Sequence, residues 1–181
     1  MWNKNIYLGS SNSLINQQEN KDFYIASRFF QDLAGEKPLY LQRANYYCSV
    51  DMYGMIVDKN GNQCPFNVEI KQRIKSKEEL ELYPEAELKK DKLVRMEKAT
   101  ASGTRLYYLS LVNSQIGYLF DMTNLDMNQV REFNWTMKKT EFSDNDQLIT
   151  VPTLGIPFSL AVHTLPLEQY YKDWYGLCAH G

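Results

Sequence analysis

The sequence is poor in the residue types and runs that mark special classes of protein. Its three cysteines are odd in number and widely spaced, without a CxxC pair, so we expect neither a disulfide framework nor a usual zinc site. No apolar run is long enough to cross a bilayer, and the N-terminal residues lack the apolar core of a signal peptide. Internal repeats, Gly/Ser linkers and low-complexity tracts are also absent. These absences favour a cytoplasmic globular protein that does not act at a membrane.

Neither sign of charge is in large excess, because the formal net charge is -2. The basic residues are nevertheless unevenly distributed: ten of the twenty lie between Lys71 and Arg105, interleaved with acidic residues. Such a segment could form a basic groove for a polyanion, because a polyanion responds to local clustering rather than to net charge. It could equally form a solvated helix face with i,i+4 ion pairs.

Apolar periodicity predicts an α/β order of elements in the first two thirds of the chain. Spacings of three and four predict a helix over residues 17–33, and strand-forming residues predict one or two strands over 39–57. We expect a second long helix from Pro84 to Ala99, with strands over 106–112 and 116–120 after it. A strand, a helix and a further strand permit a crossover connection, so part of the sheet should be parallel.

The last third gives weaker patterns. We expect a short helix over residues 128–133 and an extended stretch over 148–162, in which Pro152 and Pro157 favour an edge or irregular strand. The C-terminal aromatic residues are expected to pack against the domain or a partner subunit rather than to stack on bases.

The triplet Glu69-Ile70-Lys71 is the strongest chemical signal in the sequence. It ends an alternating apolar and polar run that begins at Phe66, the pattern of a half-buried strand. Residues two apart on a strand share a face, so the carboxylate and the ammonium would point into one site, which suits metal-assisted phosphodiester cleavage. The same Glu-x-Lys pattern occurs at Glu19–Lys21 and Glu87–Lys89. Both copies lie in stretches with helical spacing, where the side chains at positions i and i+2 point in different directions.

The hairpin before the triplet determines whether Asp51 can join it. A two-residue turn at Asn60-Gly61 would place Asp51 opposite Ile70, and therefore on the face away from Glu69 and Lys71. One extra residue in the connection, or a β-bulge, would place Asp51 opposite Glu69 or Lys71 instead. We predict such a slip, and an Asp51 side chain pointing away from Glu69 would contradict a catalytic site.

This order of elements resembles the PD-(D/E)xK nuclease superfamily over about residues 17–120. The resemblance lies in a helix, a strand with Asp51, a hairpin, the strand that carries the triplet, a helix and a strand. Val50 stands where many members have a proline before the aspartate. The resemblance implies a single domain over residues 1–181 with a three-layer restriction-endonuclease-like α/β core, in αβββαβ order, whose central mixed sheet is flanked by helices. Residues 121–181 would be a C-terminal extension packed on that core.

The resemblance also implies roles for particular residues. Asp51, Glu69 and the carbonyl of Ile70 would bind Mg²⁺, or Mn²⁺, and Lys71 would orient or help to deprotonate the attacking water. Glu19 would add an acidic group from the first helix, with Asp22 as second choice; a solvated carboxylate near the helix start is the competing interpretation. Contacts to the nucleic-acid backbone are expected from five basic residues: Arg73, Lys92, Arg95, Lys138 and Lys139.

The function predicted from these residues is Mg²⁺-dependent hydrolysis of phosphodiester bonds in DNA. The enzyme would be an endonuclease or an exonuclease of a phage, restriction or repair system, and a homodimer is one possible arrangement. Two alternatives come from other classes of protein. One is a non-catalytic nucleic-acid-binding or assembly module that keeps the fold. The other is an unrelated α+β interaction protein in which the triplet is a coincidence.

Overall fold

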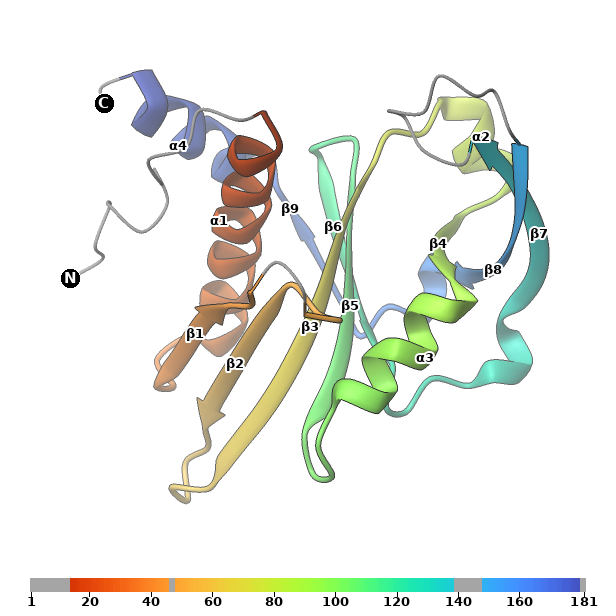
Figure 1. Ribbon diagram of the computed structural model, residues 1–181. Helices are drawn as coiled ribbons and strands as arrows, with labels where there is room; N and C mark the ends of the chain where they lie inside the picture. Colours follow the sequence, from red (N-terminus) through yellow and green to blue (C-terminus); the bar gives the residue numbers. More distant parts are fainter. Residues whose placement is uncertain (1–13, 46–47, 139–147, 180–181) are drawn as a thin grey trace.

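The computed structural model describes residues 14–45, 48–138 and 148–179, which form an α/β protein with two sheets (Figure 1). The described helices are α1 (Leu14–Ala34), α2 (Lys77–Leu82), α3 (Lys90–Ala99) and α4 (Glu168–Ala179). The described strands are β1 (Leu39–Arg43), β2 (Met52–Val57), β3 (Gln63–Arg73), β4 (Glu85–Lys89), β5 (Arg105–Val112), β6 (Ile116–Asp121), β7 (Arg131–Lys138), β8 (Leu148–Pro157) and β9 (His163–Pro166). Two short 3-10 turns, η2 (Met127–Gln129) and η3 (Phe158–Leu160), lie beside the later strands.

The larger sheet has six strands in the order β1-β2-β3-β5-β6-β9. Strands β3 and β5 are parallel, and the other neighbouring pairs are antiparallel. The chain passes from β3 to β5 through α2, β4 and α3, so the predicted crossover and its parallel strand pair are confirmed. The smaller sheet is antiparallel, in the order β4-β8-β7.

The larger sheet separates two hydrophobic cores. Helices α1 and α4 cover one face, where Phe29 and Phe30 of α1 pack with Val68 of β3. Helix α3 and the smaller sheet cover the other face, where Met96 of α3 packs with Tyr108 of β5. Alternate side chains of β3 therefore enter different layers, as the period of a strand requires.

The predicted first helix is present as α1, which is longer than expected by a few residues at its start. Its end agrees with the sequence, because Gly35 has a positive φ of 59° and its N–H donates to the carbonyl of Gln31 at 3.0 Å. This left-handed glycine is a common way to end a helix.

The hairpin between β2 and β3 contains the predicted slip. Asp58 N–H donates to the carbonyl oxygen of Asn62 at 3.0 Å, which leaves Lys59, Asn60 and Gly61 as a three-residue turn. Gly61 supplies the left-handed position of such a turn, with φ of 82°. Because the turn has one residue more than the Asn60-Gly61 pair, Met52 pairs with Val68. Continued by one residue, this register would place Asp51 opposite Glu69 instead of Ile70.

The predicted helix from Pro84 to Ala99 is wrong in its first half. Residues Glu85–Lys89 form strand β4, which pairs with β8, and helix α3 begins only at Lys90. Ala86 and Leu88, two residues apart, are both buried against the second core, as expected for one face of a strand. Glu87 and Lys89 therefore also share a face, and the helical geometry assumed for that pair does not exist.

Two expectations for the last third also need correction. The short helix predicted over residues 128–133 is a single 3-10 turn, η2, followed at once by β7. Strand β8 is the middle strand of the smaller sheet rather than an edge or irregular strand. Its Pro152 is tolerated because pairing with β4 ends at Thr153, so Pro152 pairs with β7 alone.

Helix α4 packs against α1, and it places three of the C-terminal aromatic side chains in the first core. Tyr170, Tyr171 and Trp174 are buried there, whereas Tyr175 is exposed, so packing against the domain is confirmed for the first three. Within the described residues, none of the helices combines the length and the apolar character needed to span a membrane.

Candidate active site

Strand β3 places Glu69 and Lys71 on the face that α3 covers. Phe66, Val68 and Ile70 enter the core on the α1 side, and the intervening side chains point the other way. Asn67 confirms this direction, because its amide donates to Thr100 Oγ1, beside the end of α3, at 3.1 Å. The shared face predicted for the triplet is therefore present.

Asp51 lies immediately before β2, where regular pairing with β3 ends. Its N–H donates to the carbonyl oxygen of Val68 at 2.9 Å, although Val68 already pairs with Met52. Its Oδ2 accepts a hydrogen bond from the N–H of Ile70 at 2.7 Å. Asp51 and Met52 thus both lie opposite Val68, as two residues do in a β-bulge. The Asp51 carboxylate accepts the Ile70 N–H, which in a regular ladder would donate to a carbonyl oxygen.

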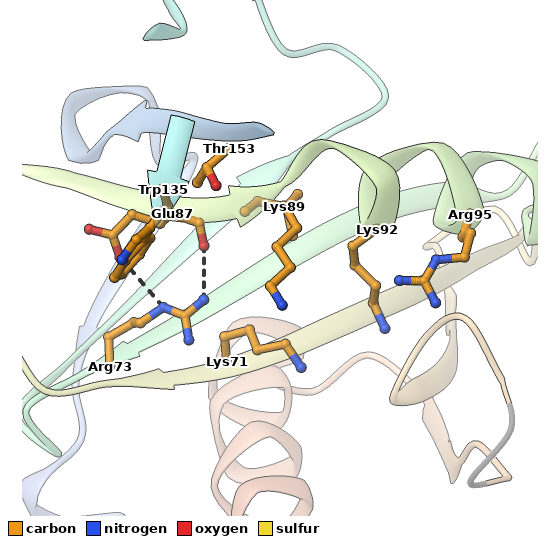
Figure 2. A pocket seen from close by; sticks show the side chains of 9 residues that line it. Lys71, Arg73, Glu87, Lys89, Lys92, Arg95, Trp135 and Thr153 are labelled. Carbon is orange, nitrogen blue, oxygen red and sulfur yellow. Dashed lines mark hydrogen bonds and ion pairs between the residues drawn. The ribbon is translucent and has the colours of Figure 1, made fainter. Parts of the chain in front are cut away.

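The carboxylate of Glu69 is completely buried between two lysines. Its Oε1 lies 2.8 Å from Lys71 Nζ, and its Oε2 lies 2.8 Å from Lys92 Nζ, with Glu69 0% exposed. Lys71 comes from β3 and Lys92 from α3, and Figure 2 shows their ammonium groups directed towards the same space. A buried carboxylate needs such partners, because an isolated charge would be too costly to desolvate.

A small acidic cavity of about 180 Å³ opens beside Asp51 and Lys71. Its lining includes Glu19 and Asp22 of α1, together with Arg43 at the end of β1. Both acidic residues considered for the first helix therefore reach the cavity that contains Asp51.

The two acidic residues of α1 have different environments. Arg43 forms an ion pair with Glu19 and donates a second hydrogen bond to Asn20. Asp22 accepts a hydrogen bond from Gln18 at 2.8 Å, and burial, with the like charge of Asp51 as a further cause, raises the pKa of Asp22 to about 6. Asp22 is therefore a carboxylate whose pKa is raised mainly by burial.

The two ends of the triplet influence each other electrostatically. Burial raises the pKa of Glu69, the negative charge of Asp51 raises it further, and Lys71 and Lys92 oppose these effects. Burial alone would lower the pKa of Lys71, but the negative charges of Glu69 and Asp51 outweigh it, and the pKa of Lys71 is raised. Lys71 is therefore a cation that is paired with Glu69 and stabilised by the charge of Asp51, and it is not poised as a neutral base.

A larger cavity of about 430 Å³ lies on the other side of Lys71, and we name it the basic cavity (Figure 2). Its cationic lining residues come from β3, β4 and α3: Lys71, Arg73, Lys89, Lys92 and Arg95. The structure thus brings together Arg73, Lys92 and Arg95, which the sequence analysis proposed for backbone contacts. Of the other two proposed residues, Lys138 ends β7 and its side chain is not described, and Lys139 lies outside the described residues.

Lys89 belongs to the basic cavity but was missed by the sequence analysis. The assumption of a helix over Glu87–Lys89 hid the signal, since on a strand both side chains point to one face. Glu87 itself is bound by cations: Lys75 forms an ion pair with its Oε1, and Arg73 Nε lies 3.6 Å from its Oε2. Arg73 also donates to the Glu87 carbonyl at 3.0 Å, so this second Glu-x-Lys pair is part of a cationic network.

The acidic residues around Asp51 and Glu69 are the candidate ligands for a metal ion. Among the described residues, no group of three or more His, Cys, Asp and Glu side chains is arranged to hold one. Mg²⁺ commonly needs only one or two carboxylates, because waters and phosphate oxygens complete its shell. Asp51 and Glu69 supply that number. Burial, and after it the negative charge of Asp51, raises the pKa of Glu69 and of Asp22, and a dication would favour the charged form of both carboxylates. In type and number these two carboxylates match what Mg²⁺ takes from a protein, while both oxygens of Glu69 are paired with lysines.

No protein-family model, characterised protein or solved structure matches this chain.

Proposed function

We propose that the protein is a Mg²⁺-dependent nuclease of the PD-(D/E)xK type that hydrolyses phosphodiester bonds in DNA. One observation carries the proposal: Lys71 stands between an acidic cavity containing Asp51 and Asp22 and a basic cavity containing Arg73, Lys92 and Arg95. Phosphodiester cleavage needs this combination, since carboxylates attract the metal and cations attract the phosphate backbone.

Each residue has a role consistent with its position. Asp51, Glu69 and the Ile70 carbonyl would hold the metal, and Asp22 is the α1 carboxylate placed to assist them. When bound, Mg²⁺ polarises the scissile phosphate and acidifies a water molecule. Lys71 would orient that water and offset the negative charge that develops at phosphorus, as a fixed cation does without reorganisation.

The fold supports the same proposal at the level of topology. Helix α1, the strands β1, β2 and β3, a crossover containing α3, and the parallel strand β5 follow in the order of a restriction-endonuclease-like core. Strand β4 is an addition within that crossover, and with β7 and β8 it builds the smaller sheet.

A second candidate, a nucleic-acid-binding module without cleavage, is favoured by one observation. Both oxygens of Glu69 are occupied by lysine ammonium groups, so a metal must displace at least one of them. If those ion pairs persist in the presence of Mg²⁺, the basic cavity would bind phosphates and no hydrolysis would follow.

The test compares wild-type protein with Glu69→Gln and Lys71→Met on single-stranded, linear, circular and branched DNA, with Mg²⁺, Mn²⁺ or chelator. We expect metal-dependent cleavage by wild-type protein and a loss of at least a hundredfold in both variants. Lys77→Met is the matched control, because Lys77 is an exposed lysine of α2 whose only described ion pair is with Glu81. Cleavage that survives both site substitutions would refute the proposal, and salt-sensitive binding without any cleavage would support the second candidate.

A further inference from the structure

The smaller sheet has one face that the hydrophobic core does not explain. Ala86, Leu88, Leu154 and Ile156 point to the second core from β4 and β8. The residues between them, which include Glu87, Lys89 and Thr153, point to the opposite face. This outer face of the smaller sheet borders the basic cavity, because Lys89 and Thr153 both line it.

Strand β7 adds aromatic side chains to this outer face. Phe133 pairs with Thr153, and Trp135 pairs with Val151, so both project on the side of Thr153. Their rings lie 6.5 Å apart between centroids at an interplanar angle of 29°, and Trp135 is 43% exposed. The exposed tryptophan and the aromatic ring beside it thus lie on the face opposite the second core.

Arg131, whose guanidinium forms an ion pair with Glu85, extends the same row of side chains. The Arg131 guanidinium lies 4.2 Å from the Phe133 ring centroid and 5.2 Å from that of Tyr83, which is itself 52% exposed. Arg131, Phe133 and Trp135 occupy alternate positions of β7, and we name them the β7 stripe. The stripe borders a further cavity of about 310 Å³, and Trp135 lines both this cavity and the basic cavity.

Aromatic rings next to a cationic groove suit single-stranded nucleic acid. The cations follow the phosphates, and each exposed ring offers a face on which an unpaired base stacks. A base within a duplex has both faces covered by its neighbours, so it cannot stack on Trp135 without leaving the helix. The basic cavity also has the volume, about 430 Å³, of a site for one nucleotide-sized ligand, since such sites span roughly 300–1,000 Å³.

We propose that the basic cavity and the β7 stripe bind a single-stranded segment of DNA, with one base stacked on Trp135 and its phosphates led towards Lys71. This inference rests on the proposed nuclease function, because it places the single strand next to the residues assigned to cleavage. It adds a substrate class: a DNA end, flap or gap with unpaired nucleotides in preference to continuous duplex.

Binding in the presence of chelator tests the inference apart from cleavage. Fluorescein-labelled oligo(dT) of about 15 nucleotides, a duplex of equal length, and a 15-mer of abasic spacers with the same phosphates would be titrated with wild-type protein, Trp135→Ala and Trp135→Phe. We expect wild-type protein to prefer oligo(dT), and Trp135→Ala to weaken that binding roughly 5- to 150-fold, the loss typical of one stacked base. Trp135→Phe should restore most of the affinity, and the abasic strand should bind wild-type protein and Trp135→Ala equally.

Tyr175→Ala is the matched control, because Tyr175 is an exposed aromatic residue of α4, on the other side of the larger sheet. It should leave binding of oligo(dT) unchanged. Equal losses for oligo(dT) and the abasic strand in Trp135→Ala, or equal wild-type affinity for duplex and single strand, would overturn the inference even if Glu69-dependent cleavage is observed. Failure of the proposed function has a different signature, namely stacking-dependent binding without cleavage in any metal.

Discussion

Replacing Asp22 by asparagine should stabilise the protein above about pH 4 and should have little effect at lower pH. Burial and the charge of Asp51 raise the pKa of Asp22 from 3.8 to about 6, so the folded state binds this proton more tightly than the unfolded state. The stability associated with the protonated carboxyl is fully present below pH 3.8 and is lost as the pH rises towards 6. Asparagine keeps the acceptor for Gln18 but carries no charge at any pH.

The size of the effect follows from that shift. Two pKa units correspond to about 3 kcal/mol at most, and partial exposure of Asp22 to water reduces the expected gain to about 2 kcal/mol. The difference between Asp22→Asn and wild-type protein should therefore be near zero at pH 3.5, should grow between about pH 4 and 7, and should stay constant above about pH 7.

Urea unfolding, followed by circular dichroism at a series of pH values in the presence of chelator, measures this difference. Glu19→Gln is the matched control, because Glu19 lies on the same helix and lines the same cavity but is paired with Arg43. It should destabilise the protein slightly rather than stabilise it. A destabilising effect of Asp22→Asn that is equal at pH 4 and pH 8 would refute the reasoning, because it would mean that folding does not raise the pKa of Asp22.

The remaining predictions concern metal, lysines and packing. Mg²⁺ at ten times its dissociation constant should raise the free energy of unfolding of wild-type protein by about 1.4 kcal/mol in urea titrations, and Asp51→Asn should remove this increase. Lys92→Ala should lower the free energy of unfolding by about 3 kcal/mol, because it leaves one oxygen of the buried Glu69 carboxylate without an ion-pair partner. Lys71→Ala, at a more exposed lysine, should lower stability less and cleavage activity more. Equal effects of the two lysine substitutions in both assays would contradict this division. Gly54→Ala should destabilise the protein by about 1–3 kcal/mol, because the new Cβ would lie 2.1 Å from the ring of buried Phe66. Gly176→Ala in α4, where the new Cβ has nothing within 4 Å, should stabilise it by about 0.5–1 kcal/mol. Thermal unfolding measures both changes.

The features that the sequence predicted well are those set by neighbouring residues. Helix α1 follows from its apolar spacing, and the shared face of Glu69 and Lys71 follows from the alternation in β3. The slip in the hairpin between β2 and β3 could also be anticipated. Only a turn with one extra residue, or a β-bulge, would bring the Asp51 carboxylate to the face of Glu69 and Lys71.

The features that the sequence missed depend on distant partners. Glu85–Lys89 is too short to show a strand period, and it becomes a strand because β8, more than sixty residues later, pairs with it. The contact between Lys92 and Glu69 joins a helix to a strand, so no local pattern contains it. Whether Glu19 or Asp22 is the better candidate for the acidic group of the site depends on the rotation of α1 against the sheet. Packing and the position of Arg43 fix that rotation.

The three-residue turn between β2 and β3 also restricts how the chain can change in length. A strand exposes alternate residues to its two faces, so an inserted or deleted residue must be looped out or it inverts the strand relative to its neighbour. At this turn an inversion would direct Asp51 away from Glu69, although the turn lies at the far end of the hairpin and contacts neither residue. Length changes of two residues preserve the faces, and relatives that retain this site should therefore differ in the Lys59–Gly61 turn by even numbers of residues.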